Sequence, residues 1–86
     1  MMMSREEIAS AVKEIFQKTL KVEPQRLDMG VHLKNDLKLD SLDMIEVVYE
    51  VEERFDVQIP EERLKEIATF GQIVDGLHAA LEAKGA

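Results

Sequence analysis

The stretch "LKNDLKLDSLDMIEVVYEVEERFDVQIPEE", residues 33–62, decides the fold. Asp40 is a favourable N-cap, because its carboxylate can accept hydrogen bonds from the free amides of a first helical turn. The segment "FDVQIP", residues 55–60, breaks the helical pattern that follows this N-cap. We therefore predict a helix over residues 41–55 whose first residue is Ser41.

The predicted helix has apolar residues on two sides when it is drawn as a wheel of about 100° per residue. One side is a stripe wide enough to face a core. Its members are Met44, Val47, Val48, Val51 and Phe55. The opposite side combines apolar and acidic residues, with Glu50 at its flank. We call this second set the recognition face: Leu42, Asp43, Ile45, Glu46, Tyr49, Glu52 and Glu53.

A helix that packs on one side only has no need of apolar residues on the recognition face. Scattered exposed apolar residues are common in proteins, so chance is one explanation. We favour the other explanation, in which the apolar residues enter a partner's pocket. The surrounding carboxylates would then pair with arginine and lysine residues of that partner.

Capping motifs predict helices on both sides of this stretch. Ser4 and Glu7 form a capping-box pattern before a helical run of apolar residues, and Thr69 and Gln72 repeat the pattern later in the chain. Pro60 suits the first position of a short helix. The expected helices cover residues 4–20, 41–55, 60–68 and 69–83.

The chain as a whole is typical of one small domain. It has 86 residues, of which 45% are hydrophobic, so a packed core is expected. We predict an all-α fold over residues 1–86: a small four-helix bundle of three main helices plus one short helix. A long loop, residues 21–40, connects the first two helices.

The net charge of −7 is concentrated in one part of the chain. Residues 40–66 hold ten acidic side chains against three basic ones, and this excess begins beside Ser41. Such a field repels nucleic acid and anionic lipid and attracts basic protein surfaces. The chain has no cysteine and no apolar run of the roughly 18–20 residues that a membrane span needs. We expect a cytoplasmic protein that binds neither nucleic acid nor membrane.

Ser41 lacks the neighbours that a catalytic serine or a metal site requires. The two histidines, His32 and His78, offer no recognisable base, and no Gly-x-Ser-x-Gly turn surrounds the serine. A calcium loop beginning at Asp36 would have Lys38 at its third position, so we predict no metal site and no catalytic residue. A capping or surface role is the ordinary one for such a serine. The helix start also favours a phosphate ester on its hydroxyl, because free amides and the helix dipole stabilise negative charge.

The stretch "DLKLDSLDMIEVVYEVEERFDVQIPEE" closely resembles the acyl carrier protein family, in which an Asp-Ser-Leu triplet opens an acidic second helix. The resemblance covers nearly the whole chain. It implies that a phosphopantetheinyl transferase attaches 4′-phosphopantetheine from coenzyme A to Ser41, within the motif that Asp40 and Leu42 complete. It also implies that the chain is not an enzyme. The thiol of the arm would hold acyl intermediates as thioesters and present them to enzymes of fatty-acid or polyketide biosynthesis.

The resemblance carries two further expectations about contacts. The recognition face is expected to contact basic-surfaced acyl-processing enzymes, namely synthases, reductases and acyltransferases, and the carrier itself is expected to be a monomer. Short acyl chains are expected to fold back into a cavity near the second and third helices. The candidate lining residues are Val48, Val51, Ile59, Leu64 and Ala68, for which ordinary core packing is the alternative.

One position departs from the family pattern. The family usually has glycine two residues before the aspartate of the triplet, and this chain has Lys38 there. A positive φ at Lys38 would strain the backbone. Asp40 and Asp43 favour an acyl carrier over an aminoacyl or peptidyl carrier, which remains one alternative. The other alternative is an unmodified acidic helical adaptor that binds one basic partner.

Overall fold

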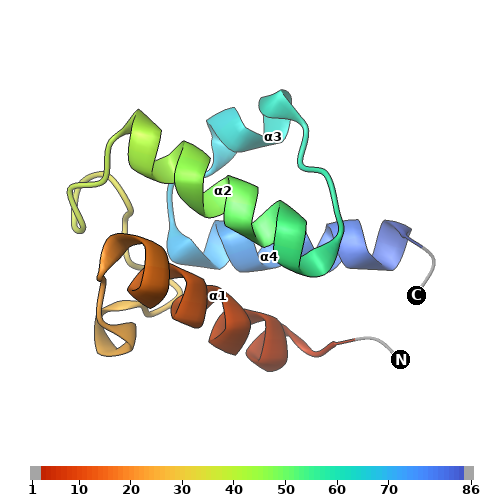
Figure 1. Cartoon of the computed structure of the whole chain (residues 1–86), viewed down its shortest axis with the longest axis horizontal. Coiled ribbons are helices and arrows are strands. Elements are labelled where there is room, and N and C mark those ends of the chain that lie inside the picture. Colours follow the sequence, from red (N-terminus) through yellow and green to blue (C-terminus); the bar gives the residue numbers. More distant parts are fainter. Residues whose placement is uncertain (1–2, 85–86) are drawn as a thin grey trace.

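The computed structural model describes residues 3–84, which form four α-helices and one 3-10 turn (Figure 1). The elements are α1 (Arg5–Leu20), η1 (Pro24–Arg26), α2 (Ser41–Phe55), α3 (Glu61–Glu66) and α4 (Phe70–Ala83). In Figure 1, α2 and α4 lie between α1 on one side and α3 on the other. Across residues 3–84 the one strand-like contact is an isolated bridge between His32 and Thr69. The predicted all-α fold of three main helices and one short helix is confirmed.

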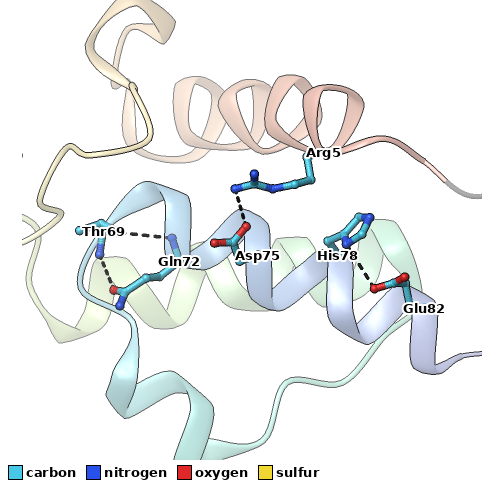
Figure 2. Close-up of polar contacts among 6 residues, drawn as sticks. All are labelled: Arg5, Thr69, Gln72, Asp75, His78 and Glu82. Carbon is cyan, nitrogen blue, oxygen red and sulfur yellow. Dashed lines mark hydrogen bonds and ion pairs between the residues drawn. The ribbon is translucent and has the colours of Figure 1, made fainter.

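The three long helices begin with capping boxes. The side chain of the N-cap residue accepts a hydrogen bond from the amide three residues later, and the side chain of that later residue accepts one from the N-cap amide. The pairs are Ser4 with Glu7, Asp40 with Asp43, and Thr69 with Gln72 (the last in Figure 2). In α1, the backbone amide of Ser4, with a smaller contribution from its hydroxyl, holds the pKa of the exposed Glu7 carboxyl below its usual value. These local motifs explain why the starts of all three helices could be predicted.

The short helix α3 differs from its prediction. It spans Glu61–Glu66 instead of residues 60–68, and Pro60 is its N-cap residue, not its first helical residue. Ile67 ends the helix because its backbone is extended, with φ −78° and ψ 115°. No residue of α3 is buried, and no side chain caps its start. Ile67 packs against the core only after the helix has ended.

The hydrophobic core lies where α1 packs against α2 and α4. At its centre the rings of Phe16 and Phe70 meet edge to face, with centroids 5.7 Å apart. An exposed ion pair between Arg5 and Asp75 also joins α1 to α4 (Figure 2). The largest fully buried side chains are Phe16, Phe70, Ile8, Leu27, Ile73, Leu77, Val12, Val47, Val51 and Val74. None of the helices in the described part of the chain has the length and apolarity to cross a membrane.

The long connection between α1 and α2 is an ordered segment that packs on the start of α4. The amide of Gly71 donates to the carbonyl of Met29 at 2.9 Å, and that of Phe70 donates to the carbonyl of Val31 at 3.1 Å. A Cβ atom at Gly71 would lie 2.6 Å from the Met29 carbonyl oxygen, so only glycine allows this approach. Four leucine side chains of the connection are buried in the core: Leu27, Leu33, Leu37 and Leu39.

Candidate functional site

Ser41 lies where the sequence predicts it, as the first residue of α2. Its side chain is exposed, whereas Leu39 is buried and its amide donates to the carbonyl of Leu33 at 3.1 Å. The connection is thus anchored two residues before the serine. The capping box follows at once: the amide of Asp43 donates to Asp40 at 2.9 Å, and the amide of Asp40 donates to Asp43 at 3.1 Å. The Ser41 hydroxyl is therefore accessible, and the backbone of Ser41 is held in place by the contacts on either side.

The start of α2 can receive a negatively charged group. The amides of Ser41 and Leu42 have no acceptor among residues 3–84, whereas the amides of Asp43 and Met44 are bound by Asp40. Free amides and the positive end of the helix dipole stabilise an anion at this position. An accessible hydroxyl beside two free amides fits a phosphodiester on Ser41. The donor set is thus suitable for 4′-phosphopantetheine.

Lys38 has the strained backbone that its place in the sequence suggested. Its φ is 60°, in the left-handed region that favours glycine. The side chain is exposed between two buried leucines, Leu37 and Leu39. The departure from the family pattern is therefore a local strain that the connection accommodates without losing its anchoring.

The apolar residues of α2 lie on the two sides that the wheel predicts, although Asp43 of the recognition face is half-buried. On the inner side Val47 and Val51 are fully buried, Val48 is buried, and Met44 and Phe55 are half-buried. On the recognition face Leu42, Ile45 and Tyr49 are 63%, 61% and 59% exposed. These three are among the largest apolar exposures of the described residues, and they lie amid carboxylates.

Glu52 differs from the exposed carboxylates of the recognition face. It is half-buried, and its Oε2 atom accepts a hydrogen bond of 2.8 Å from the amide of Ile59. On the wheel Glu52 lies next to Val48, at the border of the buried stripe, so it can reach the segment after α2. Glu52 thus holds the segment after α2 in place, and its role in docking stays a prediction. Glu53 remains exposed, and its Oε1 atom lies 3.3 Å from the hydroxyl of Tyr49.

The lining of the acyl cavity stays a prediction, and the groove that the structure shows is formed mostly by other residues. A groove of about 640 Å³ lies between residues 56–60, α3 and α4, and of the expected lining residues it contains Ile59 alone. Val51 belongs to the fully buried core, and Val48 is buried on the inner side of α2. Leu64 and Ala68 are half-buried outside the groove. Core packing accounts for the two valines, whereas the small residues Gly76, Ala79, Ala80 and Ala83 of α4 help to form the groove.

The histidines take part in local contacts away from the serine. The Nδ1 atom of His78 lies 3.4 Å from Oε1 of Glu82 on the same helix (Figure 2). The Nδ1 atom of His32 accepts a hydrogen bond of 3.1 Å from the amide of Asn35. Within residues 3–84 no group of three or more potential metal ligands comes together.

Comparisons with known proteins agree with this geometry. Residues 10–77 match the family model described as "Phosphopantetheine attachment site", which defines the class of protein. An acyl carrier protein from Amoebophilus asiaticus is 40% identical over 91% of this chain and 98% of its own length. One from Prochlorococcus marinus is 42% identical over 90% of this chain and 96% of its own length. The chain belongs to the acyl carrier protein family.

A solved structure shows the same fold. The crystal structure of an acyl carrier protein from Thermotoga maritima superposes with a TM-score of 0.84, and the match covers 93% of each chain. Sequence identity between the two is 24%, so this comparison speaks for the fold alone.

Proposed function

We propose that this chain holds acyl intermediates as thioesters on a 4′-phosphopantetheine arm that is attached to Ser41. Membership of the family makes the chain a non-catalytic carrier with a covalent arm. The observation that carries the assignment to Ser41 is its exposed hydroxyl at the first position of α2, beside free amides. The arm supplies the thiol that this cysteine-free chain lacks.

The residues around Ser41 position the attachment point. The reciprocal bonds between Asp40 and Asp43 fix the first turn of α2, and the buried Leu39 anchors the chain before it. A transferase can therefore approach a hydroxyl whose backbone does not have to be ordered on binding. The free amides of Ser41 and Leu42 can then stabilise the phosphodiester negative charge.

The recognition face supports a role in docking. A phosphopantetheinyl transferase and acyl-processing enzymes with basic surfaces would contact Leu42, Ile45 and Tyr49, with Glu46 and Glu53 at the rim. Such contacts have to be brief, because one face serves several enzymes in turn. Whether the enzymes belong to fatty-acid or polyketide synthesis, and whether the carrier is a cytoplasmic monomer, stay predictions from the sequence.

Intact mass tests this function. Incubation with coenzyme A and a broad-specificity phosphopantetheinyl transferase is expected to add the mass of one arm to the wild-type chain. Ser41→Ala is expected to abolish the gain, whereas the exposed Ser10→Ala on α1 is expected to retain it. A gain that survives in Ser41→Ala, or no gain in the wild type, would contradict the proposal.

The exposed apolar residues also support a second candidate, an unmodified acidic adaptor that binds one basic partner. The two functions differ in the mass experiment, because an adaptor gains no arm and binds its partner equally well with Ser41→Ala.

A further inference from the structure

The further inference concerns Lys38 and rests on the proposed attachment of the arm to Ser41. A phosphodiester brings a negative charge to a place that is already acidic. Asp40 and Asp43 flank Ser41, and the chain as a whole has a net charge of −7. Like charges at short range raise the free energy of the modified protein. A cation close to the phosphodiester would offset this repulsion.

Lys38 is the basic residue closest to Ser41 in the sequence. It lies three residues before Ser41, a span of at most roughly 11 Å even for a fully extended chain. The first basic residue after Ser41 is Arg54, at the far end of α2, where it pairs with Glu14. The lysine has a flexible four-carbon stem and three donors, so its ammonium can follow a group that is attached to Ser41.

The side chain of Lys38 is also available. It is exposed, and it forms no ion pair and no side-chain hydrogen bond with any other of residues 3–84. The carboxylates near it in the sequence already accept hydrogen bonds from backbone amides: Asp36 from His32, Asp40 from Asp43, and Asp43 from Asp40. The buried leucines at positions 37 and 39 leave the lysine side chain on the solvent side, as is the case for Ser41.

We propose that the Lys38 ammonium contacts the phosphodiester of the arm on Ser41 and holds it against the free amides at the start of α2. Lys38 is thus a positioning residue for the arm. It restrains the first bonds of the arm, while the thiol at the other end stays free to carry cargo.

A thermodynamic cycle tests the contact. The melting temperature is measured for the unmodified and the modified protein, in the wild type and in Lys38→Gln. Glutamine removes the charge but, like lysine, is not a glycine, so the backbone strain stays comparable. Attachment of the arm is expected to raise the melting temperature of the wild type by about 1–4 °C more than that of Lys38→Gln. The extra increment is expected to fall at high salt and to return in Lys38→Arg.

Lys34→Gln is the matched control, because Lys34 is an exposed lysine of the same connection, seven residues before Ser41. It is expected to leave the increment unchanged. In the ³¹P NMR spectrum, the phosphodiester resonance is expected to move with Lys38→Gln and not with Lys34→Gln.

The outcomes separate this inference from the proposed function. Intact mass is measured on every sample first, and a wild type that takes up no arm contradicts both. A wild type that takes up the arm but shows the same increment and the same resonance as Lys38→Gln contradicts the Lys38 contact alone.

Discussion

The two sides of α2 carry similar apolar residues in different surroundings. Val47 and Val51 are fully buried against the core, whereas Ile45 and Tyr49 are about 60% exposed on the opposite side. Burial of an aliphatic side chain stabilises the fold by about 1.5–3 kcal/mol, but an exposed one contributes little. The apolar content of this helix therefore exceeds what the fold needs. The exposed apolar residues lie among carboxylates, where another protein can contact them.

Truncation of one side chain on each side is the strongest test of this comparison. Val51→Ala is expected to lower the free energy of unfolding by about 2 kcal/mol, because it removes buried methyl groups from the core. Ile45→Ala is expected to change it by no more than about 0.5 kcal/mol. Urea unfolding of the unmodified proteins measures both values. Similar losses for the two variants would mean that the outer side also supports the fold.

Binding is expected to show the reverse order. Tyr49→Ala is expected to weaken binding of a phosphopantetheinyl transferase by about 1–2 kcal/mol, or roughly 5–30-fold in Kd, since aromatic anchors dominate small interfaces. Titration calorimetry with unmodified carrier measures this Kd. Met29→Ala is the control, because Met29 is also an exposed apolar residue but lies in the connection. Equal losses for Tyr49 and Met29 would argue against a specific face.

Charge reversal sharpens the comparison by acting on the rate of association. Glu46→Lys is expected to slow association with the transferase several-fold at low salt and to flatten its salt dependence, because rim charges steer the encounter. Stopped-flow measurements at two or more salt concentrations give these rates. Glu23→Lys, an exposed reversal before η1, is the control. Glu53→Lys should follow Glu46→Lys, and unchanged rates in both would remove the electrostatic part of the docking proposal.

The smallest expected effect concerns Lys38, which lies in the connection just before α2 and on neither of its sides. Lys38→Gly is expected to raise the free energy of unfolding of the unmodified protein by about 0.5–1 kcal/mol, because glycine adopts a φ of 60° without strain. Thermal unfolding of the unmodified protein measures the change. Lys34→Gly, at a position without a positive φ, is expected to give no gain. A loss of stability in Lys38→Gly would show that glycine raises the conformational entropy of the unfolded chain by more, in free energy, than it lowers the backbone strain of the folded chain.

The features that the sequence predicted well are those that depend on neighbouring residues. The starts of α1, α2 and α4 follow from capping boxes that close within four residues, and the two sides of α2 follow from its period. The position of Ser41 at a helix start was predictable for the same reason. The resemblance pointed to Lys38 as a position where a positive φ would cause strain, and the structure has that positive φ.

The features that the sequence did not predict depend on contacts between distant segments. Glu52 turns toward Ile59 because the chain folds back after α2, and the wheel alone places it only at a border. The groove forms where small residues of α4 lie opposite residues 56–60. The periodicity of the sequence does not predict that these two segments lie together. The true length of α3 was missed because no local pattern marks Ile67 as the extended residue that ends the helix.

The contact between Gly71 and Met29 joins the start of α4 to the connection that leads to Ser41. A side chain at position 71 would push the Met29 carbonyl away, and with it the connection that leads to Ser41. A carrier altered at this glycine would therefore be expected to remain helical and yet be a poor substrate for loading. The effect of the substitution would be measured as a lower fraction of modified Ser41, thirty residues before the substituted position.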